Sequence, residues 1–258
     1  MGVSAPPLKR EIVRLTRTED DKLPVKAVLF DLGDTLVRYY RPSEFPAVLK
    51  RSVQSSMEAL GLPHGPDQVE KLFERAKTLN RERDDHKVWP LADRLRIIFD
   101  GLIEFGDAQV GAASEGFLAP IFELARVDPD AYRVIDELRN RGLLVGIISN
   151  TPWGSSGSHW RLELERLGFQ DRVDVCVFCE DVGWRKPHGA PFRRALEILS
   201  ISPSDAVFVG DNPRWDVVGA KQAGVVPVLL APNPEVVGAD FKVIRSLGEI
   251  LDLDEIRV

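Results

Sequence analysis

One hydrophobic run, residues 25–30 (Val-Lys-Ala-Val-Leu-Phe), constrains the fold of this chain more than any other segment. It follows a proline and is rich in apolar residues, which is typical of a buried strand in a parallel sheet. Asp31 stands directly after it, at the expected carboxyl end of the strand. Open α/β sheets bind their ligands at this end of the strands, so Asp31 is a candidate for the functional site.

Two further apolar runs are also followed by polar residues of chemical interest. Residues 143–148 lead into Ser149, and residues 206–210 lead into Asp211. The carboxyl ends of parallel strands meet at one edge of a sheet, so we expect these side chains to lie near Asp31.

From residue 129 onward the chain alternates between helical and strand patterns. The predicted order is helix 129–141, strand 143–148, helix 156–167, strand 173–178, helix 188–199, strand 206–210, helix 213–223 and strand 226–230. A short strand at 241–244 and a helix at 247–251 follow. Such alternation predicts βαβ units, so the expected fold class is α/β, a Rossmann-like doubly wound parallel sheet covered by helices on both faces.

The segment 41–124 lacks strand-like alternation and has apolar residues at helical spacing instead. Four helices are predicted in it, at 42–60, 66–85, 91–105 and 114–124. In the third, four apolar residues recur along one helix face: Leu91, Leu95, Ile98 and Leu102. The expected organisation is an N-terminal extension (1–24) with a short edge strand at 11–16, an α/β core (25–40 and 125–258) and an inserted α-helical domain (41–124).

Two more charged positions complete a recognisable order. Lys186 lies in the loop Arg-Lys-Pro at 185–187, and Asp216 follows Asp211 by five residues. The order is thus Asp at one strand end, Ser at a second, Lys in a loop, and an acidic pair at a third strand end. In this order the chain resembles the haloacid dehalogenase-like (HAD) hydrolase superfamily over roughly residues 25–231. The resemblance identifies the helical insertion as the cap of a HAD protein.

The resemblance implies an enzyme that hydrolyses small phosphate monoesters. Asp31 would be the nucleophile and would form an aspartyl-phosphate intermediate. Ser149, Asn150 and nearby backbone N–H groups would bind the transferring phosphoryl group, and Lys186 would neutralise charge on the nucleophile and the phosphate.

The resemblance also implies Mg²⁺ as the cofactor, because a hard cation with oxygen ligands removes the repulsion between a carboxylate and a phosphate. Asp31 and Asp211 would supply carboxylates, and the backbone carbonyl of Gly33 would supply a further ligand. Asp216 would hold a metal-bound water or orient Lys186.

The first motif departs from the family pattern. HAD phosphatases usually have Asp-x-Asp-Gly-Thr, in which the second Asp is the general acid and base, but this chain has Gly33 there and Asp34 next. In an extended segment neighbouring side chains point to opposite sides, so Asp34 is not expected to replace the missing group. General acid–base catalysis contributes typically about 10²–10⁴-fold. We therefore expect a weak phosphatase, one that prefers good leaving groups, or one that borrows a proton donor from the cap or the substrate.

Two other functions stay open. A 2-haloacid dehalogenase would use Asp31 as a nucleophile at carbon without a metal. Dehalogenases of the family have a first motif resembling Asp-x-Tyr-Gly-Thr and lack the final Gly-Asp. This chain keeps Gly210-Asp211, which favours the phosphatase. Its Trp215-Asp216, however, is similar to the dehalogenase version. The third function is binding of a phosphate ligand or a protein partner without turnover, which would not require a nucleophile.

Composition argues against several classes of partner. The net charge is −6 and no basic patch is evident, so nucleic acid is not an expected partner. No apolar stretch approaches the roughly 18–20 residues that span a bilayer, so no membrane partner is expected either. Residues 1–21 have no apolar core of a signal peptide, which predicts a cytoplasmic protein. The expected partner is a small phosphorylated substrate, and the sequence leaves the oligomeric state open.

Substrate selection is expected in the cap and in the segment that joins it to the core. Residues 38–41 (Arg-Tyr-Tyr-Arg) follow the catalytic loop and could reach its entrance, and Trp153 and Gly154 could line the site. Arginines on the cap helices could meet an anionic substrate, although a charged helix face is more often solvated: Arg81, Arg83, Arg94 and Arg96.

Cys176 and Cys179 form a C-x-x-C pattern. The pattern falls in a predicted strand and has no second cysteine pair, which favours two small apolar side chains over a redox pair or a metal site.

Overall fold

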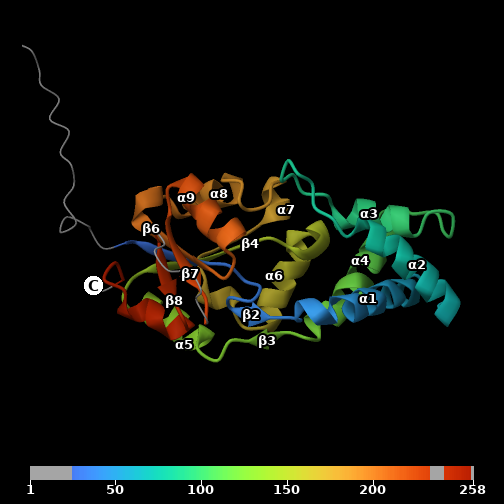
Figure 1. Ribbon diagram of the computed structural model, residues 1–258, viewed down its shortest axis with the longest axis horizontal. Coiled ribbons are helices and arrows are strands. Elements are labelled where there is room, and N and C mark those ends of the chain that lie inside the picture. Colours follow the sequence, from blue (N-terminus) through green and yellow to red (C-terminus); the bar gives the residue numbers. More distant parts are fainter. Residues whose placement is uncertain (1–24, 233–240, 257–258) are drawn as a thin grey trace, which may run out of the picture.

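The structure is a computed structural model that describes residues 25–232 and 241–256 (Figure 1). The predicted N-terminal extension, with its strand at 11–16, lies outside the described residues. Within the described ranges, none of the helices combines the length and the apolar character that crossing a membrane requires.

A six-stranded sheet forms the centre of the molecule, and all of its strands are parallel. The strand order is β5-β4-β1-β6-β7-β8. The bounds are β1 (Ala27–Phe30), β4 (Leu144–Ser149), β5 (Val175–Phe178), β6 (Ala206–Gly210), β7 (Val226–Leu230) and β8 (Lys242–Ile244). This sheet confirms the predicted α/β fold class.

Strand β1 is apolar throughout because both faces of the sheet are covered. Successive side chains of a strand point to opposite faces, so Ala27 and Leu29 pack in one hydrophobic layer and Val28 and Phe30 in the other. All four are fully buried. The first layer contains side chains of α8 (Ala190–Leu199) and α9 (Val218–Ala223), and the second contains those of α5 (Ala131–Asn140), α6 (Gly157–Arg166) and the 3₁₀-helix Leu247–Asp252.

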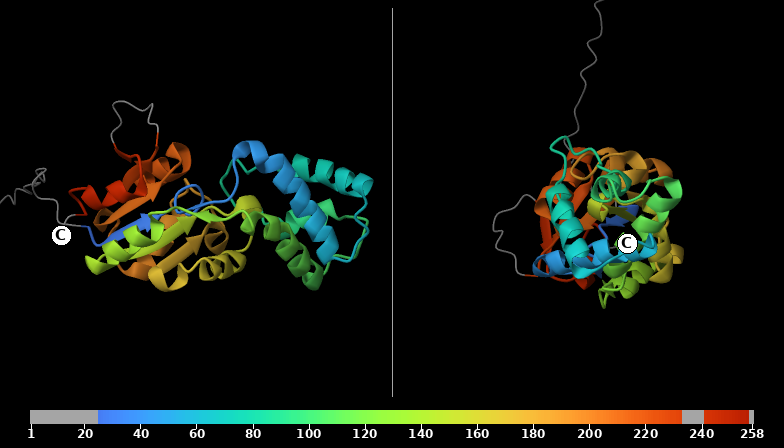
Figure 2. Two further views of the ribbon diagram at one scale, coloured as in Figure 1. Left: turned by 90° about the horizontal axis from the view of Figure 1, so that it is seen from below. Right: turned by 90° about the vertical axis from the view of Figure 1, so that its right-hand side faces the viewer.

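Four helices follow the first strand and gather at one end of the molecule (Figures 1 and 2). They are α1 (Phe45–Ala59), α2 (Pro66–Leu79), α3 (Leu91–Ile98) and α4 (Asp107–Phe122), and we call residues 42–122 the helical insert. The chain enters the insert through β2 (Val37–Arg38) and leaves it through β3 (Arg126–Val127), and these two strands pair antiparallel. The two connections are thus tied together at the base of the insert.

The helices of the insert differ in length from their predictions. Helix α2 ends at Leu79 because Asn80 leaves the helical region, with ψ of 66°. Helix α3 ends at Ile98, shortly before Gly101 adopts a left-handed φ of +77°, which glycine permits. Helix α4 begins earlier than predicted, at Asp107.

Short helical turns complete the core. Helix α7 (Cys179–Val182) was not predicted, and the predicted helix 213–223 begins as a π-helical turn, Pro213–Val217, before α9. The described residues also include a 3₁₀ turn at the start of the insert, Pro42–Glu44, and three in the core, Pro152–Gly154, Gln170–Arg172 and Pro203–Asp205.

Helices α1 and α4 pack closely at Gly116. A Cβ atom at Gly116 would lie 2.5 Å from the carbonyl oxygen of Ser55. One turn earlier, the Ser56 hydroxyl donates to the carbonyl oxygen of Ala113 at 2.9 Å. The two helix backbones therefore approach too closely for any side chain at this position.

We predict that Gly116→Ala lowers the free energy of unfolding by about 1–3 kcal/mol, because α1 and α4 must move apart. The matched control is Gly111→Ala in the same helix, where a Cβ would meet nothing within 4 Å. That change should instead stabilise the protein by up to about 1 kcal/mol. Urea denaturation of both variants measures the difference, and equal effects would contradict the packing argument.

Candidate active site

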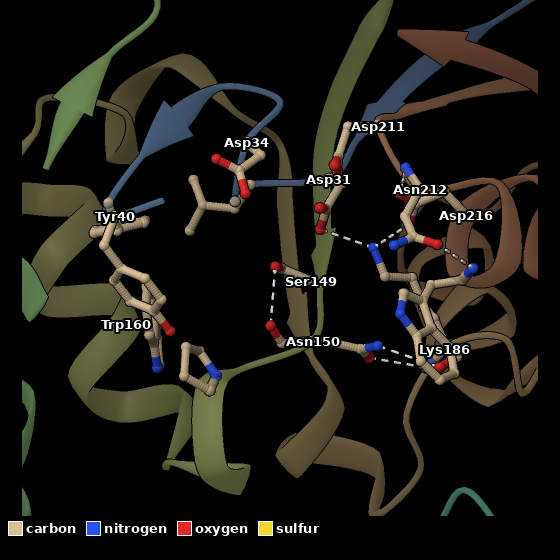
Figure 3. A pocket seen from close by; sticks show the side chains of 15 residues that line it. Asp31, Asp34, Tyr40, Ser149, Asn150, Trp160, Lys186, Asp211, Asn212 and Asp216 are labelled. Carbon is tan, nitrogen blue, oxygen red and sulfur yellow. Dashed lines mark hydrogen bonds and ion pairs between the residues drawn. The ribbon is translucent and has the colours of Figure 1, made fainter. Parts of the chain in front are cut away.

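The predicted site residues meet at the carboxyl edge of the sheet. Strand β1 lies between β4 and β6, with Phe30 paired to Ile147 on one side and to Val209 on the other. The residues that follow these strands therefore face one pocket of about 230 Å³ (Figure 3). It contains all of the predicted residues: Asp31, Gly33, Ser149, Asn150, Lys186, Asp211 and Asp216.

Lys186 is the buried centre of this arrangement. Its Nζ lies 2.7 Å from Asp31 Oδ1, 2.7 Å from Asp216 Oδ1 and 3.0 Å from the carbonyl oxygen of Ile148. The contacts with Asp31 and Ile148 are hydrogen bonds, and the contact with Asp216 is an ion pair. Burial favours the neutral amine, but the charges of Asp216 and Asp31 outweigh it, and the pKa of Lys186 lies above its ordinary value. The side chain is therefore a fixed positive charge.

Asn150 holds the backbone of that lysine. Its Nδ2 donates to the carbonyl oxygen of Lys186 at 3.2 Å, and its Oδ1 accepts from the Lys186 backbone N–H at 2.8 Å. The Asn150 side chain therefore positions the lysine loop in this structure.

Ser149 presents a hydroxyl that is nearly free. The side chain is buried, and the hydrogen bond described for its Oγ goes to the carbonyl oxygen of Asn150 at 3.5 Å. At that distance the bond is weak, so the hydroxyl can turn toward a ligand in the pocket. Figure 3 shows Ser149 between the acidic residues and the aromatic side of the pocket.

Three carboxylates lie close enough to hold one cation. Oxygen atoms of Asp31, Asp211 and Asp216 lie within 4.8 Å of one another. Asp216 is the most engaged of the three, because its Oδ1 is paired with Lys186 and its Oδ2 accepts from the backbone N–H of Asn212 at 3.0 Å. Asp31 and Asp211 therefore have the oxygens best placed for a cation.

The electrostatics of the cluster favour that cation. Burial raises the pKa of Asp31 to about 6, partly opposed by Lys186 and reinforced by Asp216. Burial also raises the pKa of Asp211 to about 7, and the charges of Asp31 and Asp216 add to the effect. Carboxylates that repel one another in a partly dry pocket are stabilised by a hard divalent cation, for which carboxylate oxygens are suitable ligands.

Asp34 corrects one expectation from the sequence. The chain turns immediately after β1, with the backbone N–H groups of Leu36 and Val37 both donating to the carbonyl oxygen of Leu32, and Asp34 has a left-handed φ of 55°. The alternation of an extended strand therefore does not apply, and Asp34 lines the same pocket as Asp31 (Figure 3). Asp34 lies at the rim of the pocket, where its side chain is exposed to solvent. Its pKa is raised above the ordinary value because its carboxyl group is partly desolvated, and the charge of Arg38 partly opposes this shift.

Gly33 has space around it. A Cβ built on this residue would meet no heavy atom within 4 Å, and its φ is outside the left-handed region. The absence of a side chain at this position is therefore not required by local packing.

Trp153 and Gly154 do not line the pocket, so this expectation was wrong. Trp153 is buried against Phe117 of α4, with ring centroids 5.1 Å apart, and a Cβ on Gly154 would collide with the backbone of Trp89. Both residues pack against the helical insert, which is a structural role.

Arg94 also corrects an expectation, because it does not face a substrate. It is fully buried, with its guanidinium 4.8 Å from the ring of Trp89 and 5.2 Å from that of Trp153. The other three arginines predicted on the cap helices are also absent from the pocket lining: Arg81, Arg83 and Arg96.

The aromatic wall of the pocket was only partly predicted. Tyr39 and Tyr40 were expected at the entrance and line it, but Trp160 of α6 was not singled out. A lone tryptophan on a predicted helix gives no signal that separates a pocket wall from an ordinary core residue.

Asn212, which also lines the pocket, was missed as well. It caps the turn after β6, and its side-chain oxygen accepts from the backbone N–H groups of Arg214 and Trp215. An Asn directly before Pro was the available signal for such a cap.

The two cysteines carry free thiols, as expected for small apolar residues. Cys176 is in β5, and burial raises the pKa of its thiol to about 12. Cys179 begins α7, one residue beyond the strand.

Comparisons with known proteins agree with this geometry. The sequence profile of a family described as haloacid dehalogenase-like hydrolase matches residues 25–224. A glyceraldehyde 3-phosphate phosphatase of Methanothermobacter thermautotrophicus is 27% identical over 239 residues, which cover 90% of this chain and 96% of that protein. The solved structure of a HAD phosphatase from Thermococcus onnurineus is 26% identical with a TM-score of 0.61, covering 88% of this chain and 96% of that one. A 2-haloacid dehalogenase from Pseudomonas syringae is 26% identical with a TM-score of 0.62, covering 88% and 97%.

We predict that the metal-free protein loses stability as the pH rises from about 4 to about 7. The raised pKa values of Asp31 and Asp211 mean that the folded state binds more protons than the unfolded chain in this window, so deprotonation disfavours folding. Mg²⁺ should reverse this loss. It should raise the free energy of unfolding by about 2 kcal/mol at about pH 8 but only slightly at about pH 5, where protons compete with the ion for the carboxylates.

Chemical denaturation with Mg²⁺ or with a chelator, at both pH values, measures this dependence. The Asp211→Asn variant is the control, because it should reduce both the loss at high pH and the stabilisation by Mg²⁺. The same gain from Mg²⁺ at the two pH values would contradict the prediction.

Proposed function

Because the chain belongs to the haloacid dehalogenase-like hydrolases and is therefore an enzyme, we propose that it hydrolyses small phosphate monoesters with Mg²⁺ through an aspartyl-phosphate on Asp31. The observation that carries the proposal is the meeting of Asp31, Ser149, Lys186 and the Asp211–Asp216 pair in one pocket at the carboxyl edge of the sheet. The likeness to a phosphatase of Methanothermobacter thermautotrophicus over 90% of the chain supports it.

The acidic cluster would hold the metal. We assign Mg²⁺ to the carboxylates of Asp31 and Asp211 and the backbone carbonyl of Gly33, with waters and a substrate oxygen completing its shell. When bound, the ion supplies positive charge that offsets the repulsion between the nucleophile and the phosphate. Asp216 instead orients Lys186, since both of its oxygens are already engaged.

The first step would be an attack of Asp31 on the phosphorus atom. One carboxylate oxygen forms a bond to phosphorus as the bond between phosphorus and the leaving oxygen breaks, which gives an acyl phosphate on Asp31. The Ser149 hydroxyl donates to an oxygen of the transferring group. The Lys186 ammonium, 2.7 Å from Asp31 Oδ1, stabilises the charge there without moving, and Asn150 keeps it in place.

The proton for the leaving group has no donor at the usual position. The family's acid–base carboxylate is absent at Gly33, so the leaving oxygen departs as an anion or takes its proton from the substrate, from water or from Asp34 at the rim. Attack of water on the acyl phosphate then lacks the usual base as well. The expected enzyme is therefore slow on poor leaving groups.

The helical insert would act as the cap, in the predicted division into a core (25–40 and 125–258) and a cap (41–124). The paired strands β2 and β3 are its two connections to the core, and Tyr39 and Tyr40 follow β2 directly into the pocket wall. Closure of the cap would exclude water during the first step.

A metal-independent 2-haloacid dehalogenase is the second candidate, supported by the likeness to the enzyme from Pseudomonas syringae. The acidic cluster favours the phosphatase, because a displacement at carbon needs no cation and gains nothing from the extra carboxylate of Asp211.

We predict that Mg²⁺-dependent hydrolysis of p-nitrophenyl phosphate falls by at least about 10³-fold in Asp31→Asn, because the amide is not a nucleophile. The control is Asp171→Asn, which removes an exposed carboxylate on the 3₁₀ turn Gln170–Arg172, outside the pocket. Retained activity in Asp31→Asn would exclude the aspartyl-phosphate. Metal-independent chloride release from a 2-haloacid would favour the dehalogenase instead.

We also predict that Gly33→Asp raises kcat/KM for alkyl phosphates by about 10-fold or more while changing kcat/KM for p-nitrophenyl phosphate little. A Cβ at Gly33 meets no heavy atom within 4 Å, and kcat/KM reports formation of the acyl phosphate, in which only the poor leaving group needs a proton. Steady-state kinetics on both substrates measure the difference. An unchanged or lower rate on alkyl phosphates would count against a missing acid as the limit.

A further inference from the structure

The pocket contains more negative than positive charge. Four carboxylates line it, from Asp31, Asp34, Asp211 and Asp216, and Lys186 is the one cationic side chain among the described residues of its lining. Lys186 is only 1% exposed and is paired with two of those carboxylates. With a divalent cation and a phosphoryl group at the acidic cluster, Asp34 would remain at the rim, beside the leaving group.

The wall opposite the lysine is aromatic. Tyr40 and Trp160 lie across the pocket from Lys186 (Figure 3). Trp160 is only 2% exposed, its ring packs edge-to-face against Tyr39 and Phe122, and its indole N–H donates to the Ser155 hydroxyl at 2.8 Å, so it supports the wall that Tyr40 presents to a ligand. Burial and the nearby Asp34 carboxylate raise the pKa of Tyr40 to about 12, so its hydroxyl is uncharged at neutral pH.

Nearby arginines face other surroundings. Arg38 and Arg126 line a separate hollow that shares only Asp34 with the pocket. The Arg185 guanidinium is paired with Glu82 at 3.3 Å and is absent from the pocket lining. Arg38 acts electrostatically on Asp34 but does not line the pocket, so inside the pocket a second negative charge on a substrate would meet Asp34 and no cationic side chain other than the already paired Lys186.

We propose, on the basis of the proposed phosphatase function, that the natural substrate has a compact leaving group without negative charge, which packs against Tyr40. A carboxylate or second phosphate there would be repelled by Asp34 in a partly desolvated pocket, which discriminates against such substrates. The volume of about 230 Å³ is below the roughly 300–1,000 Å³ of typical pockets for drug-sized ligands, which favours small polyols or aldehydes.

The test compares glycerol 3-phosphate with 3-phosphoglycerate in the presence of Mg²⁺. Both have three carbons and a primary alcohol as leaving group, but only the second carries a carboxylate. We expect kcat/KM to be at least about tenfold higher for glycerol 3-phosphate. An equal or reversed preference would overturn the inference.

Hydrolysis of p-nitrophenyl phosphate separates this inference from the function on which it rests. Activity on that ester, lost in Asp31→Asn, together with a preference for 3-phosphoglycerate overturns only the substrate class. Absence of any phosphatase activity overturns the proposed function and, with it, this inference.

Two variants test the residues themselves. Tyr40→Arg supplies a cation on the wall, and Asp34→Asn removes the repelling charge. Each should raise the ratio of kcat/KM for 3-phosphoglycerate to kcat/KM for glycerol 3-phosphate. We expect a rise of about tenfold in Tyr40→Arg and of severalfold in Asp34→Asn. Leu162→Arg is the matched charge control, because Leu162 is 65% exposed and outside the pocket. An unchanged ratio in both pocket variants, or an equal change in the control, would overturn the assignment.

Discussion

The rest of the site depends on the buried ion pairs that the ammonium group of Lys186 makes with Asp31 and Asp216. A buried cation is costly unless its partners satisfy it, and here two carboxylates and the carbonyl oxygen of Ile148 do so. The same contacts bring together the ends of β1 and β4, the lysine loop and the turn after β6. One charged group thus holds four distant segments in a single geometry and also places a fixed positive charge beside Asp31.

The parallel sheet supplies the frame for that geometry. Strand β1 is central, so its carboxyl end has β4 on one side and β6 on the other. The polar side chains of the pocket lie on short segments that follow buried strands. This explains how a chain with an ordinary hydrophobic core can place several like charges together: the core fixes the strands at whose ends they lie.

The position two residues after Asp31 sets this chain apart from the pattern it otherwise follows. Gly33 has no carboxylate, although a Cβ there would meet no heavy atom within 4 Å, and Asp34, with its left-handed φ, places a carboxylate at the rim of the same pocket. The carboxylate therefore lies at the rim of the pocket instead of at the position of the family's acid–base group. Under the function proposed above, this one shift in sequence would affect both proton transfer and the charge that a substrate can carry.

The sequence by itself determined the α/β class, the family resemblance, which the comparisons confirm, and the identity of the residues that meet in the pocket. These follow from local information, since an apolar run predicts a strand and strand ends in a parallel sheet share an edge. Only the tertiary structure decided which partner each side chain has. It turned Asp34 into the pocket through a left-handed turn, buried Arg94 between two tryptophans, directed Asn150 to the lysine backbone and made Trp160 a pocket wall. Those outcomes depend on contacts between segments far apart in the chain, which no local pattern of residues encodes.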